Sequence, residues 1–321
     1  MATGSLQRII VITGPTATGK SAVGVRLAKL IDGEIVSADS MQVYRHMDIG
    51  TAKPMGDEMC GVPHHLIDII PPWEDYSVAR YVEDASECVD DIFRRGKQPI
   101  LVGGSGLYID SLLAGRKFLV RGDPEQRRKL EDEFDKIGGD AMLVKLRSVD
   151  EISAAKLHSN DKKRIVRALE AFLTTGKPLS LHDLETVSLP RRYESIKFAL
   201  TYSDRAELYN SIDRRVDTMI TKGLIHEVRT LFDIGVSRCN TSMQAIGYKE
   251  ISDVLISDPD ISDAADILTA AEKIKMESRR YAKRQLTWLR RDNEIIWITW
   301  SGTPDHECGA QRLMEILYET K

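Results

Sequence analysis

The first hundred residues alternate between short apolar runs and longer segments whose apolar residues recur at helical spacing. The runs at 9–12, 34–37 and 99–102 contain β-branched residues and predict short buried strands. Between them, apolar residues within 23–31 and 78–93 follow a helical period, which predicts amphipathic helices. Strands that alternate with helices form parallel sheets with helices on both faces. The pattern therefore predicts an α/β fold.

Residue types that are typical of helix ends bound several of these segments. Ser77 precedes the helical segment at 78–93 and Gly96 follows it, as expected for an N-cap and a helix stop. Two later helical segments, each followed by a glycine, are 204–222 with Gly223 and 225–234 with Gly235.

No strand pattern is present between residues 116 and 193. Asp123 followed by Pro124 is a typical helix start, and a second helix is predicted over about 161–175. The strand pattern returns at 196–200. We therefore predict one core built from residues 1–115 and 196–321, interrupted by an all-helical insertion at 116–195.

A long helix is predicted from about 264 to 291, before a strand-like run at 295–300. It carries basic residues seven, four and seven positions apart, which places them on one face as a basic stripe: Lys273, Arg280, Arg284 and Arg291. The net charge is only −4, but 271–291 hold 8 Lys/Arg against 2 Asp/Glu, and 116–200 hold 18 against 14. This concentration favours a polyanionic partner; the alternative is a set of solvated basic helix faces.

The cysteines and the absence of long apolar runs limit the cellular setting. The four cysteines are far apart and form no C-x-x-C pair, which indicates neither a zinc site nor a disulfide framework. No segment resembles a signal peptide or a transmembrane helix. We expect a cytoplasmic protein that does not enter membranes, with a monomer as the default state.

The strand at 9–12 leads directly into the pattern G-x-x-x-x-G-K-S. Its residues are Gly14, Pro15, Thr16, Ala17, Thr18, Gly19, Lys20 and Ser21. In a strand–loop–helix context, the backbone N–H groups of such a loop, the helix N-terminus and the lysine hold two linked phosphates. The fold is therefore predicted to be a P-loop NTPase-like sheet that binds a phosphate-bearing ligand.

Three elements that are distant in sequence are expected to meet at this loop. Asp39 follows the strand at 34–37, and Ser105 follows the strand at 99–102. Ligands of such sheets bind at the carboxyl ends of the strands. An acidic residue beside a phosphate loop commonly holds magnesium. These features alone leave a kinase, an NTPase and a diphosphate-binding enzyme open.

Longer stretches narrow the choice, and they span nearly the whole chain. Besides the phosphate loop they are SADSMQVYR at 37–45, DIGTAKP at 48–54, VPHHLID at 62–68, LVGGSGLY at 101–108, KRIVRALE at 163–170, MQAIGYKE at 243–250 and YAKRQLTW at 281–288. With these stretches in the same order, the chain closely resembles the bacterial tRNA dimethylallyltransferases, also called tRNA isopentenyltransferases. The resemblance implies transfer of a dimethylallyl group from dimethylallyl diphosphate to N6 of the adenine adjacent to the anticodon (position 37), with Mg²⁺.

The resemblance also implies roles for individual residues. Lys20 and a magnesium ion near Ser21 would neutralise the leaving diphosphate, and Asp39 is the expected general base for the adenine amino group. Ser105 stands where the family usually has threonine, against the bridging diphosphate oxygen. The residues expected to face the tRNA anticodon stem-loop are Asp39, Ser40, Met41, Gln42, Ser105, Lys163, Arg164, Ile165, Val166, Arg167, Gln244, Gly247, Tyr248 and Lys249. Arg280 and Arg284 of the basic stripe are added to them.

Other functions share part of these signals. An adenylate isopentenyltransferase uses the same loop with a free nucleotide, a P-loop small-molecule kinase needs an arginine-rich lid, and a noncatalytic RNA-binding switch needs no base at Asp39. The helical insertion and the basic stripe favour RNA as the acceptor. For the His64-His65 pair and for the tryptophans at 288, 297 and 300, a structural role is expected.

Overall fold

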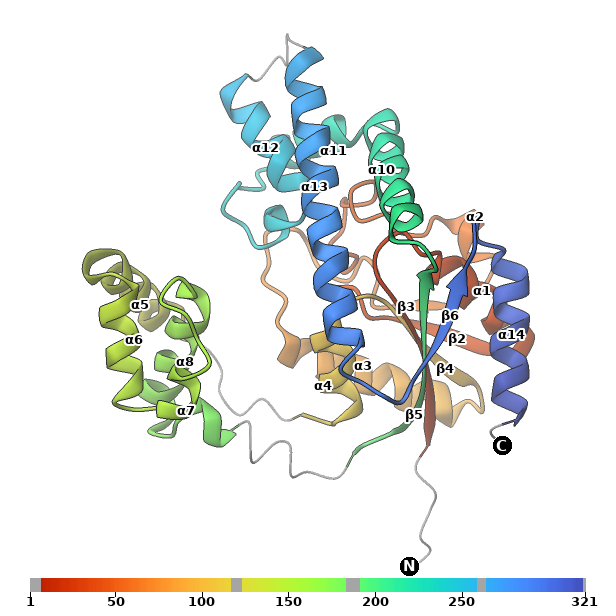
Figure 1. Cartoon of the computed structure of the whole chain (residues 1–321), viewed down its shortest axis with the longest axis horizontal. Helices are drawn as coiled ribbons and strands as arrows, with labels where there is room; N and C mark the ends of the chain where they lie inside the picture. The colour runs from red at the N-terminus through yellow and green to blue at the C-terminus, as the bar shows by residue number, and fades with distance from the viewer. Residues whose placement is uncertain (1–6, 117–122, 183–190, 259–263, 320–321) are drawn as a thin grey trace, which may run out of the picture. The chain divides into compact units, whose positions relative to one another are not determined.

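The computed structural model describes residues 7–116, 123–182, 191–258 and 264–319. A six-stranded sheet with the order β3-β2-β4-β1-β5-β6 forms the core, and all neighbouring strands are parallel (Figure 1). The strands are β1 (Arg8–Thr13), β2 (Gly33–Ser37), β3 (His64–His65), β4 (Gln98–Val102), β5 (Glu194–Tyr202) and β6 (Ile295–Trp300). The α/β fold and its five expected strands are confirmed. Among the strands of the described residues, the two-residue β3, which has no apolar run, was the one not predicted.

The strand order determines where a ligand site can form. Because β4 lies between β2 and β1, the segments that follow these three strands emerge side by side at one edge of the sheet. They are the phosphate loop after β1, Asp39 after β2 and the glycine-rich turn after β4.

Helices cover the sheet. In chain order, the helices that belong to the same part of the chain as the sheet are α1 (Lys20–Ile31), α2 (Gly56–Met59), α3 (Val78–Arg94), α4 (Gly106–Leu113), α10 (Arg205–Thr221), α11 (Leu224–Asp233), the 3₁₀ turn η1 (Ser242–Gln244), α12 (Tyr248–Ser257), α13 (Ala264–Leu289) and α14 (His306–Glu319). The first and last of them, α1 and α14, contact each other although they are far apart in sequence (Figure 1).

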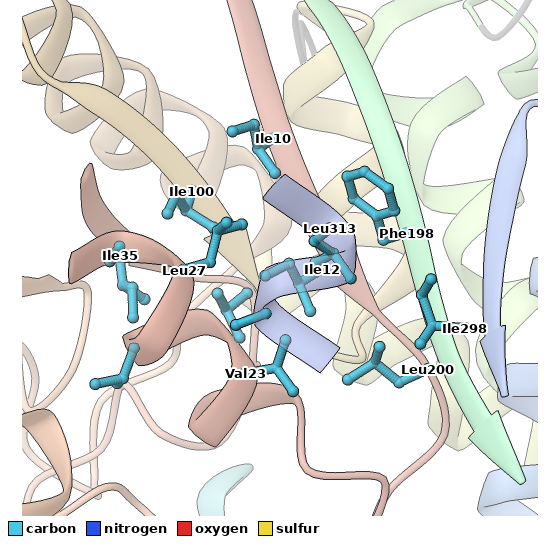
Figure 2. Close-up of a cluster of buried hydrophobic side chains, with 14 of the residues drawn as sticks. Ile10, Ile12, Val23, Leu27, Ile35, Ile100, Phe198, Leu200, Ile298 and Leu313 are labelled. Carbon is cyan, nitrogen blue, oxygen red and sulfur yellow. The ribbon is translucent and has the colours of Figure 1, made fainter. Parts of the chain in front are cut away.

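The main hydrophobic core joins these two helices to the sheet. Figure 2 shows Ile12 of β1 and Leu200 of β5 with Val23 and Leu27 of α1 and Leu313 of α14, all buried in one cluster. Burial of such apolar surface is the main stabilising contribution to a fold. The phosphate loop thus connects a strand and a helix that both belong to the core.

The predicted helix ends are confirmed by their hydrogen bonds and backbone angles. The Ser77 side chain accepts a hydrogen bond from the Arg80 N–H at 3.2 Å, which caps α3. Asp123 accepts from the Glu125 N–H at 2.9 Å and caps the helix that starts at Pro124. Gly223, between α10 and α11, has φ 100°, a conformation that favours glycine.

The chain forms two compact units. One consists of residues 1–113 and 192–321, and the other of 114–191, compared with the bounds of 116 and 195 expected from the sequence. The described part of the second unit contains no strand; its helices are α5 (Pro124–Ile137), α6 (Gly139–Arg147), α7 (Glu151–Ala154) and α8 (Lys162–Thr175). A separate cluster that includes Leu130, Met142, Leu146 and Leu169 forms its core. Among the described residues, no helix is both long and apolar enough to span a membrane.

Candidate active site

The phosphate loop lies between β1 and α1 and is held in place by neighbouring strands. At Gly14 (φ 138°), a Cβ atom would lie 2.3 Å from the Leu200 carbonyl oxygen of β5, so only glycine fits. The Trp300 indole of β6 donates a hydrogen bond to the Thr18 carbonyl at 3.0 Å. Because α1 begins at Lys20, the free N–H groups of its first turn face the loop. This arrangement suits an anionic ligand.

Two cationic side chains lie close together in the wall of this site. The Lys20 ammonium donates to the Pro15 carbonyl at 2.8 Å. Burial and the nearby charge of Arg215 lower the pKa of Lys20 to about 7, while the charge of Asp39 opposes the change. Burial also lowers the pKa of Arg215. Desolvated cations that repel each other are stabilised by an anion, so this wall favours a polyanionic group such as a diphosphate.

The carboxylate of Asp39 is oriented by the turn that follows β2. Its Oδ1 accepts hydrogen bonds from the backbone N–H groups of Met41 at 2.9 Å and Gln42 at 3.4 Å. In the part of the chain that the structure describes, Oδ2 has no hydrogen-bond partner. One oxygen is therefore fixed by the backbone, and the other is available to a ligand.

Two cavities meet at Asp39. The first, of about 430 Å³, is lined by residues 16–21 of the phosphate loop, including Lys20 and Ser21. The second, of about 390 Å³, has apolar walls from α10 and α13 and polar walls from Ser40 and Gln244. The residues that line both cavities are Thr16, Asp39, Arg215 and Tyr281. A group bound in either cavity can reach Asp39.

Ser105 lies against the turn that follows β2, and its expected contact with the bridging diphosphate oxygen stays a prediction. Its hydroxyl accepts a hydrogen bond from the Ser40 N–H at 3.1 Å and donates to the Ser40 hydroxyl at 3.4 Å. It belongs to the lining of neither cavity, although Gly103 and Gly104 line the first. In this structure Ser105 therefore supports the turn that carries Asp39.

Among the cavity-lining residues that had no predicted role are Arg215, Tyr281 and Gln285. Arg215 lies on the apolar face of α10, next to Ile212 and Val216, and an arginine at such a position is a signal in the sequence. Tyr281 and Gln285 belong to the YAKRQLTW stretch of α13. Nothing local to that stretch indicates that they reach the phosphate loop.

Gln285 connects two of the loops that form the site. Its Oε1 accepts a hydrogen bond from the Thr16 N–H at 2.9 Å, and its Nε2 donates to the Gly104 carbonyl at 3.0 Å. Tyr281, one turn earlier, lies near Asp39, and burial together with that charge raises the pKa of its hydroxyl to about 12. The tyrosine therefore remains a neutral hydrogen-bonding group at neutral pH.

The predicted tRNA-facing residues of the core fall into two groups. Ser40, Met41, Gln244 and Arg284 line the second cavity, and Gln42 lines the first; Lys249 is exposed. Gly247 and Tyr248, by contrast, are buried, and the Tyr248 hydroxyl donates to Glu227 at 2.6 Å. Packing against the 48–50 segment covers the Tyr248 ring, and contact of this residue with tRNA stays a prediction.

The basic stripe on α13 is only partly available. Arg284 lies 5.7 Å from the Tyr281 ring centroid and lines the second cavity. Arg280 is exposed but pairs with Glu277 at 2.6 Å, and Lys273 lies 3.8 Å from Asp253. Arg291 lies beyond the end of the helix at Leu289.

The predicted residues of the insertion also separate by exposure. Lys163 and Arg164 are exposed, and Arg167 pairs with the buried Glu170 at 2.7 Å. Ile165 and Val166 have exposed fractions of 0% and 1% and belong to the core of the insertion. Only one face of this amphipathic helix reaches solvent, so these two side chains support the insertion, and their contact with tRNA stays a prediction.

The histidine pair and the tryptophans have the structural roles that were expected. His65 Nε2 lies 2.8 Å from Glu34 Oε2, and His64 Nδ1 lies 2.8 Å from the Val62 carbonyl. Trp300 is buried in the main core, whereas Trp288 and Trp297 pack against a smaller cluster at Leu289 and Ile295.

Comparisons with known proteins show which family the chain resembles. The IPP transferase family profile matches residues 42–292, and an isopentenyl transferase profile matches residues 7–68. A tRNA dimethylallyltransferase of Pelobacter propionicus is 46% identical over 296 residues, which cover 92% of this chain and 94% of the relative. The tRNA dimethylallyltransferase of Caldanaerobacter subterraneus subsp. tengcongensis is also 46% identical, over 97% of each chain.

Solved structures show the same similarity. The full-length tRNA isopentenylpyrophosphate transferase of Bacillus halodurans matches with a TM-score of 0.70 and 39% identity, covering 98% of this chain and 96% of the other. A eukaryotic dimethylallyltransferase acting on tRNA matches with a TM-score of 0.75 and 30% identity, covering 91% of this chain and 74% of the other.

Proposed function

The chain belongs to the IPP transferase family of tRNA dimethylallyltransferases, and we propose that it transfers a dimethylallyl group from dimethylallyl diphosphate to N6 of the tRNA adenine adjacent to the anticodon. The observation that carries this assignment is Asp39 in the wall shared by two cavities. One cavity is bounded by the phosphate loop and takes the diphosphate. The other, with apolar side walls, takes the adenine, which must leave the stack of the anticodon loop to enter it.

In this reaction the C–O bond of the allylic diphosphate breaks and an N6–C bond forms. Negative charge accumulates on the departing diphosphate, where Lys20, Arg215 and the backbone N–H groups of the loop stabilise it. The proton displaced from N6 passes to Asp39, whose Oδ2 is free of hydrogen bonds within the described structure. The products are the modified adenine and inorganic diphosphate.

The donor set around the loop fits a magnesium ion that is shared with the substrate. The Ser21 hydroxyl and the Asp39 carboxylate line the first cavity, but the described residues contain no group of three or more His, Cys, Asp or Glu side chains that could by itself hold a metal ion. Mg²⁺ is commonly held by one or two protein groups together with substrate phosphates and water. When bound, it supplies positive charge to the diphosphate oxygens.

The exposed basic residues complete the proposal. Lys163 and Arg164 of the insertion, with Arg280 and Arg284 of α13, would contact phosphates of the anticodon stem-loop. We assign the enzyme to the cytoplasm because its substrate is tRNA, and we propose that it acts as a monomer.

A transfer assay tests the assignment against its alternatives. The protein is incubated with radiolabelled dimethylallyl diphosphate, Mg²⁺ and either tRNA or AMP. Label on tRNA alone is the expected result. Label on AMP would indicate a free-nucleotide isopentenyltransferase, and label on neither acceptor would exclude prenyl transfer to adenine.

A further inference from the structure

Glu227 of α11 binds a segment of the DIGTAKP motif from outside the two cavities. Its Oε2 accepts hydrogen bonds from the backbone N–H groups of Asp48 at 2.9 Å and Ile49 at 2.8 Å. Its Oε1 accepts from the Gly50 N–H at 3.1 Å and from the Tyr248 hydroxyl at 2.6 Å. Consecutive backbone N–H groups that converge in this way form a binding site for an anion, and here the anion is a side chain.

The bound segment forms part of the wall of the second cavity. Gly50 and Thr51 line the second cavity. A Cβ atom at Gly50 would lie 2.4 Å from the Tyr248 ring, so the segment passes directly over the tyrosine that also contacts Glu227. The position of this wall therefore depends on a carboxylate 177 residues away in the sequence.

The segment is also hydrogen-bonded to side chains that line the first cavity. The Thr51 carbonyl accepts from Gln42 Nε2 and from an Arg215 nitrogen, each at 3.4 Å. Gln42 and Arg215 both line the first cavity. A shift of residues 48–50 would thus act directly on the second cavity, which Gly50 lines, and only indirectly on the first, which it would reach through Ala52 and through these two long hydrogen bonds.

A second anchor keeps the motif folded independently of Glu227. The buried Lys53 ammonium donates to the Tyr44 carbonyl at 2.8 Å and to Asp48 Oδ1 at 2.6 Å, and it also contacts Asp68. Loss of the Glu227 carboxylate would therefore change the orientation of residues 48–50 without releasing the whole motif.

We propose that Glu227 is a positioning residue for the acceptor adenine. Its carboxylate fixes the 48–50 backbone, and this backbone presents Gly50 and Thr51 to the base that enters the second cavity. The inference rests on the proposed function, because that function assigns the second cavity to the adenine.

The test compares two Glu→Gln variants of the full chain. In Glu227→Gln, one acceptor oxygen remains and an NH₂ group faces backbone N–H donors, so the segment must move. Glu34→Gln is the matched control: Glu34 is a buried carboxylate at the start of β2, bound to Arg95 and His65. Steady-state constants for tRNA, affinity for a nonreactive allylic diphosphate analogue, and melting temperature are measured for each variant.

We expect Glu227→Gln to lower kcat/KM for tRNA by roughly ten- to a hundredfold, the size of effect that a small misplacement of a reacting group produces. Its affinity for the analogue should stay within about threefold of the unaltered chain, since the hydrogen bonds to Gln42 and Arg215 are weak. The control should lose thermal stability and keep its constants for tRNA. If Glu227→Gln does not fold, Glu227→Asp takes its place. This variant keeps the charge but withdraws it by one methylene, so it should lower kcat/KM for tRNA by a smaller factor.

Two results would overturn the inference. One is kcat/KM for tRNA that is no lower in Glu227→Gln than in Glu34→Gln. The other is a loss of analogue affinity as large as the loss for tRNA, which would indicate general damage to the site. If the unaltered chain fails to modify tRNA, the proposed function itself is wrong, and this failure is recognised before any variant is compared.

Discussion

Asp39 has one carboxylate oxygen held by backbone N–H groups and the other without a hydrogen-bond partner among the described residues. This difference allows a substitution that changes only the proton acceptor. Asp39→Asn keeps an acceptor for the Met41 N–H but removes the proton acceptor. Turnover should fall by about two to four orders of magnitude, the usual contribution of a general base. Binding of a diphosphate analogue should persist. Single-turnover rates at saturating tRNA provide the measurement, and an unchanged rate would exclude Asp39 as the base.

Lys20 should behave differently, because it faces charge that is present before and during the reaction. Lys20→Ala removes a cation that lines the first cavity, so analogue binding and the rate of transfer should weaken together. Lys29→Ala, at an exposed position of the same helix, is the control. Titration with a nonreactive allylic diphosphate tests the prediction. Affinity equal to that of the unaltered chain would mean that the loop is not the diphosphate site.

At the scale of elements, one buried carboxylate joins β2 and β3 to the segment after α3. Hydrogen bonds from Arg95, and then from His65, lower the pKa of Glu34 from 4.5 to about 2, although its burial opposes this change. A carboxylate whose pKa is lower in the folded state stabilises the fold above its unfolded pKa. That contribution, on the order of 1–3 kcal/mol, is lost as the pH falls from 4.5 to about 2.

Denaturant unfolding of Glu34→Gln and of the unaltered chain across this pH range tests the contribution. The difference in unfolding free energy should be largest near neutral pH and should shrink below pH 4.5. Glu194→Gln serves as the comparison, because its pair with Arg8 is half exposed and 3.7 Å long. A difference for Glu34→Gln that does not change with pH would contradict the assigned cause.

At the scale of the whole molecule, the two compact units each carry exposed basic residues. If both units bind tRNA, removal of Lys163 and Arg164 from one, or of Arg280 and Arg284 from the other, should weaken binding. The slope of log affinity against log salt should fall by about 0.7 to 0.9 for each tRNA phosphate that is no longer neutralised. Affinity for the allylic diphosphate should not change in the Lys163 and Arg164 variant.

Affinity for tRNA at several salt concentrations, together with the melting temperature, distinguishes this function from the alternative. Solvated faces or internal ion pairs would leave the slope unchanged and would affect only stability. The two arginines on α13 are less available to tRNA phosphates, since Arg280 already binds Glu277 and Arg284 lines the second cavity. A smaller change in slope is therefore expected for that pair than for Lys163 and Arg164.

The sequence by itself determined the features that depend on neighbouring residues. Strand runs, the Ser77 and Asp123 caps and the glycine stops are local, because backbone preferences act within a few residues. The phosphate loop was also predictable, since loops with this pattern hold phosphates mainly through the backbone and one lysine of a single segment. Asp39 followed from the rule that ligands bind at the carboxyl ends of parallel strands.

Only the tertiary structure decided which distant side chains share the site. Gln285, Tyr281 and Arg215 enter it because α13 and α10 pack over the strand ends, and no local pattern specifies that docking. Packing against the 48–50 segment buries Tyr248. In the insertion, Ile165 lies on the apolar face of α8 and is buried in that unit's own core. A motif identifies residues that a family shares, but packing determines which of them reach a ligand and which support the fold.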